Sequence, residues 1–501
     1  MRTQFHSASA PTTVRRFRVR ALAMLALGTV VTGCSLDSLL RGSDLPSDVV
    51  DPGAYKTESG SISLYQHAHI ALERALGVMG GFGRPASYVN AAAILSDEVQ
   101  YLVPSTTAYP NDPSAYIDAR QLPQNDFSTS GIALSSSAHD VFAALHNVRI
   151  AAREAEGAIA KYGPNLPRAL RGHMYAFEAF AQILLSELYC SGIPLTTLEF
   201  ETGYTQTRGF STEEVLKRAV RLLDTALVLS ADSARIQHFA RIVQGRAYLN
   251  LGYYDSAALA VRDVPSEYTY TIQYMYGSTV FTWSLDATEE AWDARTMGDR
   301  KGTTGLPYVS SGDPRTRAIQ LQPGIMFPAK FGGWGNDKLI IASGIEAQLM
   351  IAEHELSKGN TGEWLNILNR LRTTGAFTIQ PRPGDAGMVD TAWVPGSGRV
   401  LFPNQATPLP GIRPLTDPGN PTDRVSLQFE ERAYWLYLTG HRQGDMRRLV
   451  RQYRRLESQV YPSGKWGPLA LANYGADVNL PTPVQEQMTN KLYTGCINRD
   501  A

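Results

Sequence analysis

The chain has 501 residues, and its 47 lysines and arginines equal its 47 aspartates and glutamates in number, so its formal net charge is zero. A chain of this length can bury a large hydrophobic core, and a balanced charge gives it no overall field that would attract a polyanion. Because no basic cluster follows the first 20 residues, we expect no binding to nucleic acid.

The first 33 residues have the pattern of an export signal. Arginines at positions 15, 16, 18 and 20 precede an apolar run, Ala21 to Val31, that is too short to span a bilayer as a mature helix. The run leads into Val31-Thr32-Gly33-Cys34, which resembles the lipobox where bacterial signal peptides are cut before an acylated cysteine. We predict a signal peptide over 1–33, lipidation of Cys34 and a lipid-anchored tether over 34–57. The alternative is an ordinary signal peptide followed by an incidental cysteine.

Amphipathic patterns predict helices through most of the next 200 residues. Apolar residues recur at helical spacing in five places: after Ser61, from about Ser87, from Ser137 to Lys161, after Leu166, and after the N-cap candidate Ser211. Each pattern leaves one polar face, so we expect these helices to pack against one another around a shared core.

The helix that begins near Ala234 introduces a repeat. Small, aromatic and turn residues stand at the spacing of a tetratricopeptide repeat, namely Gly245, Tyr248, Gly252, Tyr254 and Ala257. A second helix pair turns at Gly359-Asn360 and has apolar residues at Ile345, Leu349, Ala352 and Leu356, then at Trp364, Ile367, Leu368 and Leu371. This repetition predicts a stacked helical scaffold over about 58–264 and 344–374.

Three stretches lack a helical period. Tyrosines and prolines fill Tyr101 to Asp126, aromatic residues are frequent over about 265–343, and Gly375 to Thr422 is rich in proline and glycine. Alternation at Tyr268, Tyr270 and Ile272 predicts short strands within the aromatic stretch. We therefore predict a loop from 101 to 126, an aromatic insertion over 265–343 and an irregular insertion over 375–422.

Aromatic rings on such loops favour ligand binding. The C–H face of a sugar packs on a ring while polar groups at the rim take its hydroxyls, and an extended peptide can use the same rings. We predict that the ligand-facing residues are Tyr101, Tyr109, Trp283, Trp292 and Trp334. The alternative, in which the rings form a secondary core, stays open for each residue.

Catalytic and metal-binding patterns are missing from the sequence. It contains no Gly-x-Ser-x-Gly elbow, phosphate-binding glycine loop, His-Glu-x-x-His or Cys-x-x-Cys motif. His67 and His69 are two positions apart on a predicted helix and point to different sides, while Asp417, Asn420 and Asp423 are better explained as turn residues than as calcium ligands. We predict no catalytic residue, metal or cofactor, although a pair of glycosidase carboxylates distant in sequence stays open.

The last part of the chain, residues 423–501, begins with a run dense in charge. The run from Arg424 to Leu449 predicts a helix, a break at Gly440 and a second helix that starts near Asp445. Arginines and carboxylates this close together favour a partly buried, hydrogen-bonded network of ion pairs. The residues that we assign to this structural role are Glu431, Arg432, Arg442, Asp445 and Arg447. A catalytic role for Glu430, Glu431 and Asp445 is the alternative.

The same run carries a family resemblance. Phe429-Glu430-Glu431-Arg432, Gly440-His441-Arg442 and Asp445-Met446-Arg447-Arg448 resemble the C-terminal signature of the SusD/RagB outer-membrane lipoproteins. Four further segments are similar to elements of that family: Leu95-Ser96-Asp97-Glu98, the turn from Leu188 to Leu195, Asp313-Pro314-Arg315 and Leu480-Pro481-Thr482-Pro483. In the turn, Cys190 stands where most members have glycine.

The resemblance implies a mainly α fold, a tetratricopeptide-like SusD-like scaffold over 58–501 with irregular, loop-rich and short-strand insertions. It also implies a lipoprotein at the outer-membrane surface that binds an oligosaccharide or peptide, passes it to a TonB-dependent (SusC-like) transporter and is not an enzyme. Two alternatives from the residues stay open, a secreted carbohydrate-active enzyme and a repeat scaffold that contacts only proteins.

Two cysteines remain after Cys34. Cys190 and Cys496 belong to an exported chain, where thiols can pair, and a bond between them would staple the C-terminal tail to the helical body. Sequence spacing leaves the disulfide an open possibility, because geometry decides whether two cysteines can reach each other.

Overall fold

Helices form most of the structure, as the sequence predicts. The computed structural model describes residues 56–77, 87–102, 113–122, 129–199, 203–273, 295–328, 330, 338–374, 390–394, 398–402, 412–466 and 473–501. Residues Tyr55 to Ala501 pack as one unit. Within the described ranges, no helix combines the length and apolar composition that crossing a bilayer requires.

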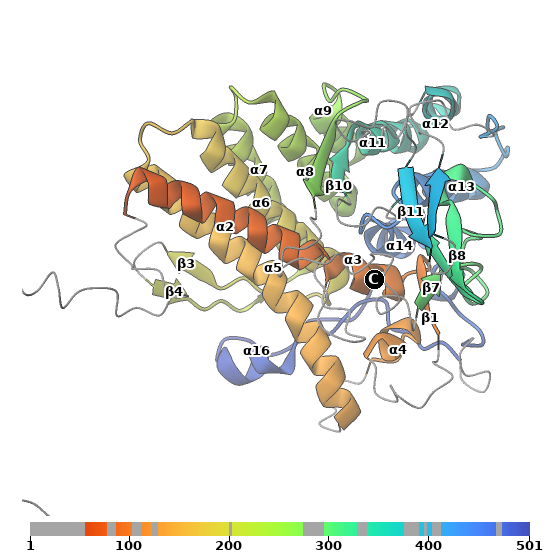
Figure 1. Ribbon diagram of the computed structural model, residues 1–501, viewed down its shortest axis with the longest axis horizontal. Coiled ribbons are helices and arrows are strands. Elements are labelled where there is room, and N and C mark those ends of the chain that lie inside the picture. Colours follow the sequence, from red (N-terminus) through yellow and green to blue (C-terminus); the bar gives the residue numbers. More distant parts are fainter. Residues whose placement is uncertain are drawn as a thin grey trace, which may run out of the picture. The chain divides into compact units, whose positions relative to one another are not determined.

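Four long helices form the first half of this unit. They are α2 (Glu58–Gly77), α5 (Thr129–Tyr162), α6 (Arg168–Leu188) and α7 (Thr212–Leu229), and Figure 1 shows them running side by side. α2 packs on α5, α5 on α6, and α6 on α7. α6 lies in the centre of this layer, since every residue from Ala176 to Leu188 is buried.

Helix α7 shows how the sequence sets these boundaries. The Ser211 side chain accepts a hydrogen bond from the Glu214 backbone N–H, and the Glu214 carboxylate accepts one from the Ser211 N–H. This reciprocal capping box satisfies two backbone donors that a helix start otherwise leaves free. The predicted apolar stripe faces α6, with Val215, Ala219 and Leu223 fully buried.

The predicted repeats are two stacked helix pairs. They are α8 (Ala234–Leu251) with α9 (Tyr254–Val261), and α11 (Gly344–Ser357) with α12 (Thr361–Thr374). Gly252 and Gly359 both have φ of 78° in the turns, a conformation that side chains with a Cβ rarely adopt. Gly245 lets α8 approach its neighbours, because a Cβ there would lie 2.6 Å from Met350 Sδ. The tetratricopeptide-like stacking is therefore confirmed.

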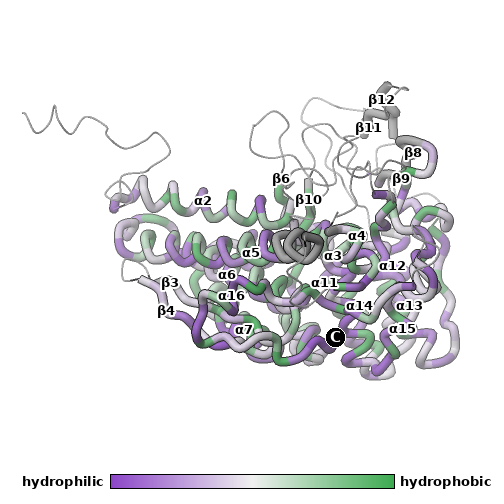
Figure 2. The backbone as a smooth tube through the Cα atoms, turned by 90° about the horizontal axis from the view of Figure 1, so that it is seen from below, coloured by the Kyte–Doolittle hydropathy of each residue, from purple (hydrophilic) through white to green (hydrophobic). Residues whose placement is uncertain are grey.

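The strands form antiparallel two-stranded sheets that are inserted between helices. The pairs are β1 (Val99–Tyr101) with β7 (Arg295–Met297), β2 (Ile193–Pro194) with β5 (Gly209–Phe210), β3 (Thr197–Glu199) with β4 (Gly203–Thr205), β6 (Thr269–Gln273) with β10 (Lys338–Ser343), β8 (Ala318–Gln322) with β9 (Ile325–Pro328), and β11 (Asp390–Val394) with β12 (Gly398–Phe402). Figure 2 shows β6, β10, β8 and β9 along one side of the helices, with α7 on the opposite side.

Seven further helical segments lie in the described ranges of the chain. They are α3 (Tyr88–Leu95), α4 (Pro113–Asp118), the 3-10 turn η1 (Pro314–Thr316), α13 (Pro421–Trp435), α14 (Arg442–Arg451), α15 (Glu457–Val460) and α16 (Val484–Thr489).

Three local predictions were wrong. α4 lies inside the stretch predicted as a loop, because six residues are too few to show a helical period. The β11–β12 hairpin lies inside the stretch predicted as irregular. α14 begins at Arg442, three residues before the predicted start at Asp445, directly after the Gly440 turn with its φ of 76°.

Candidate functional site

The C-terminal signature builds a buried network of ion pairs. Asp445, 4% exposed, accepts hydrogen bonds from Arg432 Nε at 2.8 Å and from Arg448 Nη2 at 2.9 Å. Arg448 also makes a two-pronged pair with Glu353 of α11, at 2.6 and 3.0 Å. Burial alone would raise the pKa of Asp445, but the two guanidinium groups hold it well below its ordinary value. α13, α14 and α11 are thereby joined through one carboxylate.

The network extends to segments far away in the sequence. Arg442 donates from Nε and Nη2 to the two oxygens of Asp97, at 2.7 and 2.9 Å, across 345 positions. Glu431 accepts from Arg315 Nη1 and Nη2 at 2.8 and 3.0 Å, and Arg372 donates to it as well. The motif segments named in the sequence therefore supply partners for the C-terminal signature, with Asp97 bound by Arg442 and Arg315 bound to Glu431.

Arg447 has a different kind of partner. Its Nη1 donates to the backbone carbonyls of Ser186 and Tyr189, at 2.6 and 3.0 Å, where α6 ends. A cation at this position compensates carbonyls that a helix end leaves without an intrahelical donor.

These carboxylates are poorly placed for catalysis. Glu431 and Asp445 are 2% and 4% exposed, and arginine donors occupy the oxygens of both. Such groups cannot reach a substrate without breaking the network. Glu430, the third carboxylate of the catalytic alternative, is partly exposed, and burial raises its pKa. The arrangement therefore favours a structural role for Glu431 and Asp445.

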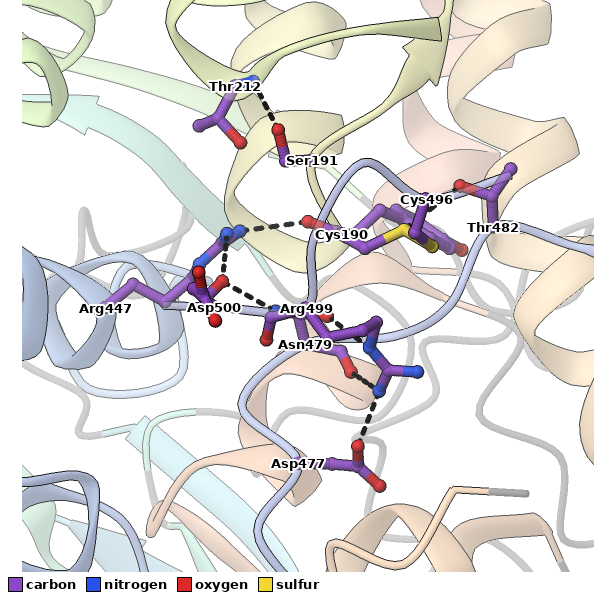
Figure 3. The surroundings of a disulfide bond; sticks show 11 residues. Cys190, Ser191, Thr212, Arg447, Asp477, Asn479, Thr482, Cys496, Arg499 and Asp500 are labelled. Carbon is purple, nitrogen blue, oxygen red and sulfur yellow. Dashed lines mark hydrogen bonds and ion pairs between the residues drawn. A yellow bond between two sulfur atoms is a disulfide. The ribbon is translucent and has the colours of Figure 1, made fainter. Parts of the chain in front are cut away.

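A disulfide joins the C-terminal tail to the end of α6. Cys190 and Cys496 are bonded, with their Cα atoms 5.8 Å apart and 306 positions between them in the sequence (Figure 3). The Cys190 N–H donates to the Leu480 carbonyl at 2.8 Å, so the segment around Leu480-Pro481-Thr482-Pro483 lies against the same turn. Cys190, which replaces the glycine of the family pattern, thus supplies one half of this bond.

Of the five predicted ligand-facing residues, Tyr101 lies within the described structure and the other four lie outside it. Tyr101 lies in β1 and is 2% exposed, packed with Ala119, Trp466 and Tyr474. Its ring is part of a core cluster, so the structure offers it to no ligand and we do not propose it as a contact. Tyr109, Trp283, Trp292 and Trp334, and also the lipidation site Cys34, lie outside the described residues.

Other rings of the aromatic insertion also pack inward. Tyr270 is 3% exposed and shares a hydrogen bond of 2.7 Å with His173 Nε2, and Tyr308 is fully buried. The sequence could not separate these residues from exposed rings, because a two-stranded sheet buries every second side chain only where a helix covers it.

The residues that flank the predicted aromatic contacts lie in paired strands. Gln273 precedes the interval with Trp283 and Trp292 and pairs with Lys338, which follows the interval with Trp334. Arg295 follows the first of these intervals and pairs with Tyr101, just before the interval with Tyr109. Each of these two strand pairs therefore brings the boundaries of two aromatic intervals together.

The buried Glu98 and the half-buried Lys330 lie close in sequence to the boundaries of these intervals. The Glu98 carboxylate accepts from the Leu438 N–H at 2.7 Å, and Lys330 donates to the Tyr437 carbonyl. Burial raises the pKa of Glu98 and lowers that of Lys330, while each charge partly offsets this effect on the other. The turn after α13 thus contacts both Glu98, which precedes β1, and Lys330, which follows β9.

One shallow pocket of about 400 Å³ lies next to α4. Tyr116, Arg120, Gln121 and Asp477 contribute to its lining. Their polar groups are largely used within the chain, since Arg120 donates to the carbonyls of Asp477 and Pro462, and Gln121 Nε2 donates to the Asn473 carbonyl. In the described part of the chain, no three histidine, cysteine or acidic side chains cluster as metal ligands would.

The calcium alternative has a simpler explanation in the structure. Asn420 caps α13 by accepting from the Asp423 N–H at 2.9 Å, and Asp417 accepts from the Gly419 N–H at 2.9 Å and pairs with Arg424. These are turn and capping interactions, as the sequence predicts.

The sequence analysis did not identify the buried glutamates on α11 and α6 that pair with arginines. Glu353 of α11 and Glu187 of α6 are 0% and 3% exposed, and Glu187 pairs with Arg246 Nη2 at 2.5 Å. The available signal was a glutamate on the apolar face of a helix, which requires a buried cation nearby.

Comparison with known proteins identifies the fold. No family model matches the sequence, and no curated protein matches it. Solved structures do match. A SusD superfamily protein from Bacteroides thetaiotaomicron is 14% identical, with a TM-score of 0.57, over 88% of this chain and 99% of that one. The surface glycan-binding protein A of the same species is 11% identical, with a TM-score of 0.57, over 89% and 100%. A laminarin-binding SusD-like protein is 14% identical, with a TM-score of 0.57, over 89% and 100%. The chain therefore has the fold of the SusD superfamily.

Proposed function

We propose that this chain is a cell-surface lipoprotein that binds glycan nutrients and passes them to a TonB-dependent, SusC-like transporter in the outer membrane. Cys34 carries the lipid anchor in this proposal, and Tyr109, Trp283, Trp292 and Trp334 contact the ligand. Two of the matching structures are named as a glycan-binding and a laminarin-binding protein, which supports carbohydrate as the ligand class.

One observation carries the binding proposal. The boundaries of the three aromatic intervals meet at two strand pairs, Gln273 with Lys338 and Arg295 with Tyr101. A rigid helical body that presents several aromatic segments from neighbouring points is suited to hold a polymer at more than one sugar. Peptide ligands use aromatic rings too, so both classes belong in the test.

Binding without turnover is part of the proposal. Glu431 and Asp445 are bound by arginines, and the matching structures are named as binding proteins. A carbohydrate-active enzyme would convert a glycan and would lose that activity when a carboxylate is replaced. Product analysis after incubation with the bound glycan distinguishes the two functions.

The test is a glycan and peptide array on the soluble chain that begins after Cys34. We expect a signal from one glycan class that falls at least about tenfold when Trp283, Trp292 and Trp334 are all replaced by alanine. The matched control is Tyr204→Ala, which removes an aromatic ring that is 70% exposed on the β3–β4 hairpin. Equal loss in the control, or no loss in the tryptophan variant, would refute the assignment of the binding residues.

A further inference from the structure

A second pocket lies within the tetratricopeptide-like repeats. It has a volume of about 510 Å³ and is formed by residues 252–256, in the turn between α8 and α9, together with Ser357 and Lys358 at the end of α11. This volume is within the range of small-molecule sites. The pocket is built entirely from the tetratricopeptide-like scaffold.

An aromatic ring forms part of its surface. Tyr253 is 46% exposed, whereas the neighbouring Tyr254 packs inward and donates its hydroxyl hydrogen to Gln452 Oε1 at 3.2 Å. The Tyr253 backbone is fixed, since its N–H donates to the Tyr248 carbonyl and its own carbonyl accepts from the Ala257 N–H, both at 2.9 Å. The ring is therefore held by a rigid turn, which lowers the entropy cost of binding.

Charged groups stand beside the ring. The Asp255 carboxylate accepts from Lys358 Nζ at 3.0 Å, and His354 Nδ1 lies 3.2 Å from it. Both members of the Asp255–Lys358 pair are exposed, so water screens their attraction and the pair contributes little to the fold. A carboxylate accepts hydrogen bonds and an ammonium donates them, so together they satisfy adjacent hydroxyl groups, which do both.

We propose that this pocket is a second carbohydrate-binding site, in which a sugar ring packs on Tyr253 and its hydroxyls bind Asp255 and Lys358. Because Asp255 and Lys358 balance each other in charge, the pair gives an acidic or phosphorylated ligand no net attraction, and the ligand class is neutral glycan. This inference rests on the proposed function, because the same polymer would occupy both sites.

The separation of the pocket from β10 bears on the length of glycan that can extend beyond the pocket. β10 leads directly into α11, and the pocket lies at the far end of this helix of 14 residues. At 1.5 Å per residue, the helix alone separates the pocket from β10 by about 21 Å. A short oligosaccharide in the pocket cannot reach back to β10, whereas a long polysaccharide can, and it gains avidity when it occupies both sites.

The experiment measures stoichiometry and affinity by calorimetry on the soluble chain, using the glycan class found on the array as a short oligosaccharide and as the polymer. We expect two oligosaccharides per wild-type chain and one per Tyr253→Ala chain. For the polymer, the affinity of Tyr253→Ala should fall at least about tenfold. Tyr204→Ala is the matched control for loss of an exposed ring, and Tyr253→Phe should keep both binding events.

The outcomes separate this inference from the proposed function. An unchanged stoichiometry in Tyr253→Ala, with binding lost in the tryptophan variant, overturns the second site and leaves the proposed function intact. Binding that survives in the tryptophan variant and disappears in Tyr253→Ala supports the second site and overturns the assigned loop contacts. A wild-type chain that binds neither form of any glycan overturns both.

Discussion

Removal of Asp445 tests whether the ion-pair network stabilises the fold. In the Asp445→Ala variant, Arg432 loses the carboxylate that its Nε contacts at 2.8 Å, while Arg448 keeps Glu353. Arg432 is 2% exposed, so water cannot replace the lost acceptor. One buried guanidinium group is thus left without compensation, and we expect the folded state to lose free energy relative to the unfolded chain.

The expected magnitude follows from the burial. Removing one member of a buried ion pair costs about 3–5 kcal/mol, because the remaining charge keeps its desolvation penalty. The unfolding entropy increases with the size of the folded unit, which here extends from Tyr55 to Ala501. For a unit of this size, a loss of 1 kcal/mol in the free energy of unfolding lowers Tm by about 1 °C. We therefore expect Tm to fall by about 4 °C, measured by circular dichroism at neutral pH.

The control is a pair of the same chemistry at the surface. Asp417 accepts from Arg424 Nε and Nη2 at 2.7 and 2.8 Å, but both side chains are partly exposed. Water solvates Arg424 when its partner is removed, so Asp417→Ala should leave Tm unchanged within error. Equal shifts in the two variants, or no shift in Asp445→Ala, would show that burial of the network does not determine its contribution.

Three further predictions concern the tail, a buried histidine and the repeats. Cys496→Ala should lower the free energy of unfolding by up to about 5 kcal/mol, because the Cys190–Cys496 bond closes a loop of 306 residues; a urea midpoint equal to wild type would contradict this. Burial lowers the pKa of His173. As the pH drops below 6.5, this histidine therefore binds a proton in the unfolded chain before it does so in the folded chain. The free energy of unfolding should then decrease by up to about 1.4 kcal/mol per pH unit. Tm recorded from pH 7.5 to 5.5 checks this, and His173→Asn with the wild-type slope would refute it. Gly245→Ala should lower the free energy of unfolding by about 1–2 kcal/mol despite the better helix propensity of alanine, since the added Cβ would lie 2.6 Å from the Met350 sulfur. The control is Gly362→Ala, whose added Cβ has no atom within 4 Å and should not destabilise the fold. Equal urea midpoints for the two variants would contradict this prediction.

Local signals in the sequence were enough for the helical scaffold. The stripe of α7 and the capping pair Ser211 and Glu214 are set within one or two turns of helix, so periodicity predicts them directly. The repeat glycines Gly252 and Gly359 could be identified for the same reason, because each marks a turn that only a residue without a Cβ adopts easily.

Ion pairs between residues far apart in the sequence could not be predicted from local signals. The sequence identified Arg442 and Asp445 as members of a charged network, yet Arg442 pairs with Asp97, 345 positions away, while Asp445 pairs with Arg432, 13 positions away. Charge pattern shows that a buried arginine needs a carboxylate, but only the packing of helices decides which carboxylate is near. Tyr101 illustrates the same limit, since its burial depends on Trp466 and not on its own neighbours.

The charged C-terminal run and the residues next to the aromatic intervals are nevertheless connected in the fold. The Tyr437 hydroxyl donates to the Glu98 carbonyl at 2.9 Å and the Leu438 N–H donates to the Glu98 carboxylate, so the turn after α13 holds the residue that precedes β1. Lys330, which follows β9, donates to the Tyr437 carbonyl. The turn after α13, which lies between two parts of the C-terminal signature, therefore holds residues next to the points where the described chain borders two aromatic intervals. Because the proposed ligand contacts are other residues than the members of the charged network, a substitution at one of those contacts can change binding without removing an ion pair of the network.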